Sequence, residues 1–68
     1  MLAEQIVATE LARSFYGNRL WGDMSARQKA RASEDCLPDA RELQANDPIS
    51  FTTILRLRLD ADARVACE

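Results

Sequence analysis

The side chains that could do chemistry are two cysteines, Cys36 and Cys67, and a group of acidic residues. Histidine is absent from all 68 residues, which removes the usual general base near neutral pH and the commonest transition-metal ligand. Neither cysteine belongs to a C-x-x-C pair, and the two glycines, Gly17 and Gly22, cannot build a phosphate-binding loop. We therefore predict that the chain is not an enzyme and that it has no catalytic residues, no cofactor and no metal.

Cys36 closely follows Glu34 and Asp35, and these carboxylates are expected to raise the pKa of its thiol and weaken it as a nucleophile. We interpret Cys36 as a small packed residue. Cys36 and Cys67 could form one bridge, but Glu4 stands where a secretory signal would be basic. The sequence therefore predicts reduced thiols and a cytoplasmic location, in the cytosol of a bacterial host.

The length of the chain limits how much it can bury. Its 68 residues are fewer than the roughly 100 to 150 of a typical domain, so residues 1–68 are expected to form a single helical domain. A chain this short buries only about 60% of the surface that it exposes when unfolded, and a second copy often completes its core. A homodimer is therefore one predicted partner. No apolar stretch approaches the roughly 20 residues needed to cross a bilayer, so no membrane association is predicted.

Five acidic residues lie between positions 34 and 47. The calcium-loop pattern with its central glycine is missing, so this run does not predict a calcium site. Two interpretations stay open, a solvated acidic face and a docking surface for a basic protein. The second makes candidate protein-binding residues of Glu34, Asp35, Asp39, Glu42 and Asp47.

The net charge of −2 conceals a separation of charge along the chain. Residues 13–31 hold five cations and one acid, whereas residues 34–47 hold five acids and one cation. Either the two segments lie close together and compensate each other, or one of them forms a partner-binding face. The cations of the basic segment would be the phosphate-facing residues of a nucleic-acid surface. They are Arg13, Arg19, Arg27, Lys29 and Arg31.

A cluster of large side chains follows the first expected helix, formed by Tyr16, Leu20, Trp21 and Met24. Trp21 and Met24 could cap the open end of a small helical core. Alternatively the cluster anchors a protein partner, because tryptophan and tyrosine are enriched in binding hot spots. On that interpretation Trp21, with the nearby Arg13 and Arg19, forms a secondary contact.

One apolar stripe predicts a helix over residues 2–16, made of Leu2, Ile6, Val7, Leu11 and Phe15. Gly17 and Asn18 are expected to end it, because both residue types tolerate the left-handed conformation of a C-terminal cap. Ser25 and Gln28 form a capping box that predicts the start of a second helix. Pro38 interrupts that helix, and a short third helix is expected over residues 39–45.

The C-terminal segment is compatible with a helix and with a strand. Asp47 followed by Pro48 is a helix start signal. Residues 55–60 alternate apolar and charged side chains, which is the period of a half-buried strand, and a helix would place Arg58 and Asp62 on its apolar face. The spacing of these opposite charges nevertheless favours a helix. We predict an all-α bundle of three to four helices, with a strand paired across a dimer as the alternative for this segment.

Residues 15–36 are similar to two kinds of protein. The spacing of five residues resembles the last two helices of HMG-box domains, where tryptophan and lysine mark the same turn and helix; they are Trp21, Met24, Ser25, Lys29 and Cys36. That resemblance implies DNA binding by phosphate contacts and an apolar wedge. HMG boxes are strongly basic, whereas this chain has a net charge of −2. Nucleic acid is therefore the less favoured partner.

The same stretch also resembles short phage and prophage proteins, on Tyr16 with Gly17, on residues 21–25 (WGDMS) and on the arginines and lysine that follow. This resemblance implies an accessory protein of a mobile element. The group includes small acidic inhibitors of host defence complexes, such as anti-CRISPR proteins, which occlude a nucleic-acid channel or lock a subunit by surface contact.

These observations lead to one principal hypothesis and two alternatives. The principal hypothesis is a phage-type interaction protein that inhibits or adapts a protein complex of a bacterial host, such as a CRISPR-Cas effector, by placing the acidic run 34–47 in a basic groove. The alternatives are a small nucleic-acid-binding regulator that uses residues 13–31 and a structural or assembly protein of a phage particle.

Overall fold

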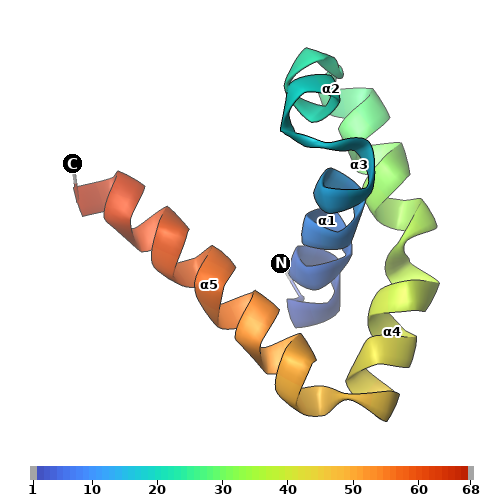
Figure 1. Cartoon of the computed structure of the whole chain (residues 1–68). Helices are drawn as coiled ribbons and strands as arrows, with labels where there is room; N and C mark the ends of the chain where they lie inside the picture. Colours follow the sequence, from blue (N-terminus) through green and yellow to red (C-terminus); the bar gives the residue numbers. More distant parts are fainter. Residues whose placement is uncertain (1, 68) are drawn as a thin grey trace.

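The computed structural model describes the backbone of residues 2–67 and the side chains of residues 2–64, and this part of the chain forms five helices and no strand (Figure 1). They are α1 (Ala3–Tyr16), α2 (Asn18–Asp23), α3 (Ala26–Asp35), α4 (Leu37–Asn46) and α5 (Pro48–Cys67). The all-α prediction is confirmed. The count of three to four helices and the strand alternative for the C-terminal segment are wrong.

Helix α1 ends where the sequence indicates. Gly17 has a φ of 85°, a conformation that residues with a side chain rarely adopt, and its N–H donates a 2.9 Å hydrogen bond to the carbonyl of Arg13. The predicted apolar stripe is only partly correct, because Val7 is fully buried whereas Phe15 is 81% exposed. The buried face of α1 is completed by two alanines, Ala8 and Ala12.

Helix α2 is absent from the sequence prediction. Asn18 begins this helix instead of capping α1, and its side chain accepts a 3.1 Å hydrogen bond from Arg13 Nε. None of the six residues of α2 is buried. The apolar periodicity that reveals a helix in a sequence is therefore missing here, since it arises from one buried face.

Helix α3 begins at the predicted capping box. The backbone N–H of Gln28 donates to Ser25 Oγ at 3.1 Å, and the backbone N–H of Ser25 donates to Gln28 Oε1 at 2.8 Å. Two N–H groups that the helix itself leaves without partners are thereby satisfied.

Replacing Ser25 with alanine is expected to lower the free energy of unfolding by about 1 kcal/mol, because one end of the reciprocal cap is lost. In a chain of this size the same loss lowers the thermal midpoint by about 4–8 °C. Circular dichroism in urea and on heating measures both quantities. Thr52→Ala, on an exposed position of α5, is the control and leaves the midpoint unchanged or slightly raised. Equal effects of the two substitutions would contradict a role of the cap.

The break between α3 and α4 lies at Cys36, close to its predicted place. Helix α4 starts at Leu37, two residues earlier than expected, and Pro38 lies in its first turn, where a missing N–H removes no helical hydrogen bond. Cys36 itself has dihedral angles of the helical region, φ −91° and ψ −2°. The two helices therefore follow each other as one arc along a side of the molecule (Figure 1).

Helix α5 starts at the predicted Asp47 and Pro48 signal. Asp47 Oδ1 accepts the backbone N–H of Ser50 at 3.2 Å and Oδ2 accepts its hydroxyl at 2.6 Å, and these bonds lower the pKa of Asp47. Arg58 is half-buried on α5, and its guanidinium lies 2.6 Å from Asp62 and 3.3 Å from Glu10 of α1. The ion pairs explain why the alternating pattern forms a helix.

The core is small and consists mainly of alanine. Helix α1 lies at the centre and packs against α3, α4 and α5, and Glu4 joins it to Arg41 of α4 at 3.2 Å. Alanine lets helices approach closely but contributes little apolar area. The buried apolar residues are Val7, Ala8, Ala12, Ala32, Ala40 and Phe51.

Candidate functional site

All five predicted acidic residues are exposed, and four of them belong to α3 and α4. Asp39 and Glu42 are three residues apart on one face of α4, and Asp35 is the last residue of α3 before it. We call these three residues the acidic stripe. Glu34 lies beside the stripe, and Asp47 lies beyond the end of α4.

The five acids differ in how far they are already engaged. Asp35 forms an ion pair with Arg31 at 3.4 Å, and Asp47 caps α5 with both carboxylate oxygens. Among residues 2–64, Glu34, Asp39 and Glu42 form no ion pair. These three carboxylates are therefore available to a partner, whereas Asp47 has a structural task.

The predicted basic segment does not form one continuous surface. Arg13 pairs with Glu10 at 3.9 Å, and Lys29 Nζ lies 5.8 Å from the centre of the Trp21 ring. Arg31 is bound to Asp35, as described above. Within the described side chains only Arg19 and Arg27 of this segment lack such an intrachain partner. A phosphate backbone would therefore have to compete for most of these cations.

The aromatic and apolar cluster of the sequence is divided between two sides of the molecule. Tyr16, Leu20 and Met24 line one hollow. Trp21 lines a different hollow beside α1 and α5, together with Arg13 and Arg58. Trp21 and Met24 are both half-buried, whereas Leu20 is 59% exposed.

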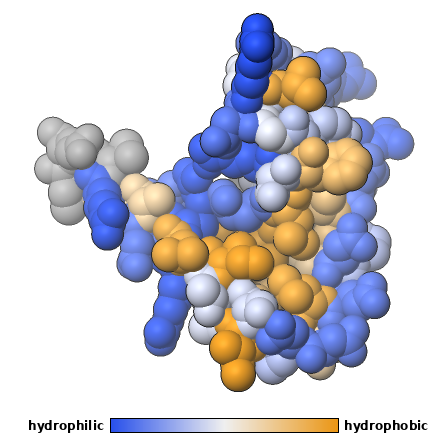
Figure 2. Space-filling model, in the orientation of Figure 1, coloured by the Kyte–Doolittle hydropathy of each residue, from blue (hydrophilic) through white to orange (hydrophobic). Residues whose placement is uncertain are grey.

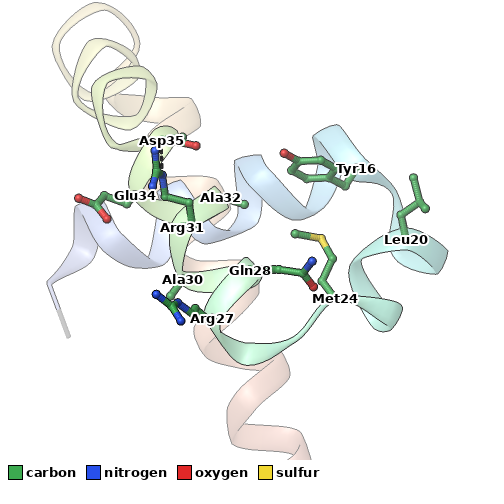
Figure 3. Close-up of a pocket in the computed structure, with 10 residues that line it drawn as sticks. All are labelled: Tyr16, Leu20, Met24, Arg27, Gln28, Ala30, Arg31, Ala32, Glu34 and Asp35. Carbon is green, nitrogen blue, oxygen red and sulfur yellow. Dashed lines mark hydrogen bonds and ion pairs between the residues drawn. The ribbon is translucent and has the colours of Figure 1, made fainter.

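The first of these hollows is the candidate functional site. It has a volume of about 840 Å³ and runs from the end of α1 over α2 along α3 (Figure 3). Tyr16, Leu20 and Met24 form its apolar end, and the ion pair of Arg31 with Asp35 lies at the other end (Figure 3). Its remaining lining residues are Arg27, Gln28, Ala30, Ala32 and Glu34. The hollow therefore joins exposed apolar side chains to two of the predicted acidic residues.

The sequence does not predict this combination. Its pattern groups Tyr16 and Leu20 with Trp21 and places Phe15 on the buried stripe of α1. A pattern of residue types cannot separate the two sides of α2, because the short helix turns Leu20 and Trp21 in different directions. The exposure of Phe15 also leaves no signal in the sequence, since its spacing from Leu11 is that of a buried stripe.

Cys36 is a half-buried thiol. Burial raises its pKa most, and the charges of Asp39 and Asp35 raise it further. The sequence predicts the same direction of the pKa shift. The causes differ, because burial and Asp39 contribute and Glu34 does not. A thiol with a raised pKa is a poor nucleophile near neutral pH. The side chain of Cys67, and with it any pairing of the two cysteines, lies outside the described residues.

The described part of the chain has neither a cluster of metal ligands nor a membrane-spanning helix. No three acidic or thiol side chains there converge as metal ligands would. No helix between residues 2 and 67 combines the length and the apolar character needed to cross a membrane.

Comparison with protein-family models, curated proteins and solved structures found no match to the chain. The similarities to HMG boxes and to phage proteins therefore stay predictions.

Proposed function

We propose that the chain is a small interaction protein that binds a basic surface of another protein with the α3–α4 side. The observation that carries the proposal is the hollow of Figure 3, which has the apolar side chains of Tyr16, Leu20 and Met24 at one end and Glu34 and Asp35 at the other. The acidic stripe continues from the end of this hollow along α4.

The two parts of this surface have different tasks. Tyr16, Leu20 and Met24 offer the apolar contact from which most binding energy comes, because hot spots in interfaces are mainly large side chains that become desolvated. Glu34, Asp39 and Glu42 offer negative charge that is not neutralised within the chain, and such charges speed association and select a basic partner. Binding needs no reactive group, which agrees with the poor nucleophile at Cys36.

The partner that we infer is a protein complex of a bacterial host, such as a CRISPR-Cas effector, that the chain inhibits or adapts by occupying a basic groove. This step is supported by the resemblance of residues 15–36 to phage proteins and by the acidic side of the α3–α4 arc. A groove that normally holds a nucleic acid is lined with cations, and Glu34, Asp39 and Glu42 would offer such cations three carboxylates that form no ion pair among the described side chains.

Removing the charges of Asp39 and Glu42 is expected to weaken partner binding about fivefold. Each of the two exposed ion pairs lost contributes roughly 0.5 kcal/mol, which makes about 1 kcal/mol together. The partner is captured from a bacterial lysate on the wild-type chain and identified by mass spectrometry, and its affinity is then measured by calorimetry at low and high salt. Replacing Glu34 and Asp35 with alanine as well should enlarge the effect, and the difference between variants should shrink at high salt.

The matched control removes the same two charges elsewhere. Asp23→Ala with Asp60→Ala changes the net charge equally, and both residues are exposed on other helices. We expect this control to bind as the wild-type chain does. Unchanged affinity of the Asp39 and Glu42 variant would reject the acidic surface. A shift of duplex DNA at low salt that disappears steeply with added salt would favour the basic segment 13–31 instead.

A further inference from the structure

Part of the C-terminal half of α5 is exposed beyond its contacts with α1. Phe51 is 4% exposed, and Ile54 and Leu55 are half-buried against the core, but every residue from Leu59 to Arg64 is exposed. Figure 1 shows this half of the helix projecting away from the other four helices. Helices in water owe most of their stability to packing of one face, so this half calls for a covering surface.

A groove between α1 and α5 continues the exposed part of α5. Its apolar lining is formed by Leu11 of α1 and by Ile54, Leu57 and Ala61 of α5, and its volume is about 410 Å³. Leu57 is 66% exposed. Figure 2 shows apolar surface spreading from the middle of α5 over the face between α5 and α4.

The charges at the edge of this groove are neutralised inside the chain. Glu10 lies 3.9 Å from Arg13 and 3.3 Å from Arg58, and Arg58 also pairs with Asp62. An incoming surface therefore meets an apolar floor with little net charge around it. This electrostatic character differs from that of the acidic stripe on α4, so the two surfaces suit different occupants.

The chain exposes more surface than a compact monomer of its length. Its accessible surface is 5261 Å², against roughly 4,300 Å² expected for a folded monomer of 68 residues, an excess of roughly 1,000 Å². The radius of gyration is 12.1 Å, against roughly 11 Å expected. A stable interface of standard size covers about 800 Å² on each partner. The excess is therefore enough for one such interface.

We infer that the groove between α1 and α5 is the contact between two copies of this chain, with Leu57 of each copy seated against Leu11 and Ile54 of the other. The apolar groove is exposed in the single chain, and a second copy of the chain is available wherever the chain is synthesised. A two-fold contact uses the same patch twice, which requires a patch without strong net charge. The charged residues at the groove, Glu10, Arg13, Arg58 and Asp62, are two acids and two cations joined by ion pairs, and they meet that requirement.

The inference is tested by the mass of the full chain in solution, measured by sedimentation and light scattering under reducing conditions. We expect the wild-type chain to have twice the mass of one copy and Leu57→Glu to dimerise at least tenfold more weakly. Ile49→Glu is the matched control, an apolar residue of the same helix that is 79% exposed and does not line the groove. It should stay dimeric.

A second measurement covers the case in which Leu57→Glu does not fold. The thermal midpoint of a dimer rises with protein concentration, because association stabilises the folded chain. The milder Leu57→Ala should reduce that dependence, and Ile49→Ala should keep it. A wild-type chain that is monomeric at every concentration, a dimer that Leu57→Glu and Leu57→Ala leave unchanged, or larger oligomers that do not stop at two copies would each overturn the inference.

Discussion

Replacing Phe51 with alanine is expected to unfold most of the chain at room temperature. Phe51 is the one aromatic side chain in the buried cluster of the described residues, where it packs with Val7, Ala8 and Ala40. Removing a buried phenylalanine costs about 3–5 kcal/mol, which equals most of the stability that a domain of this size has. Circular dichroism at 25 °C and urea titration measure the loss of helix.

The control for Phe51 lies two residues away on the same helix. Ile49 is a large apolar residue that is 79% exposed, so Ile49→Ala should change the free energy of unfolding by no more than about 0.5 kcal/mol. The comparison separates loss of core packing from a general effect of alanine in α5. A Phe51→Ala chain as helical and as stable as Ile49→Ala would show that the core is not organised around Phe51.

The end of α1 and the starts of α3 and α5 could be predicted from the sequence, because caps are local. Ser25 with Gln28 and Asp47 with Pro48 act through atoms no more than a few residues apart, and the structure shows their hydrogen bonds as expected. The alternating run in α5 was ambiguous for the opposite reason. Its outcome depends on Glu10 of α1, which pairs with Arg58 across the fold, and no local pattern contains that partner.

The choice of buried residues was less predictable. Phe15 continues the apolar stripe of α1 in sequence, yet it is exposed. Ala8 and Ala12 are buried instead, and alanine carries no strong preference for the inside or the outside of a helix. Which face of α1 is covered is decided by α3 and α4, and their approach is a property of the whole fold.

The charges of the candidate site can be predicted from the sequence, whereas its shape cannot. Glu34, Asp39 and Glu42 are exposed and unpaired among the described side chains, as an acidic surface requires. Asp47 has the same charge, but the cap of α5 engages it. Leu20 of α2 lines the hollow beside Tyr16, and the sequence pattern does not predict α2 as a helix. The apolar part of the surface therefore follows only from the fold.

Enlarging Ala40 is the second substitution with a large expected effect. Ala40 of α4 is 0% exposed and belongs to the same cluster as Ala8 of α1, so leucine at this position has no space without moving α4. Inserting such a volume into a packed core costs about 1–3 kcal/mol or more. Leucine forms helices almost as well as alanine, so helix propensity does not contribute to the loss.

Ala45 provides the comparison for Ala40, since it lies on the same helix and is exposed. Ala45→Leu should leave the free energy of unfolding within about 0.5 kcal/mol of the wild-type value, whereas Ala40→Leu should lower the thermal midpoint by at least about 5 °C. Heating followed by circular dichroism measures both variants. Small residues at buried positions allow helices to approach each other closely. Equal midpoints would mean that α1 and α4 are not in close contact at Ala40, and the alanine core would then be incorrect.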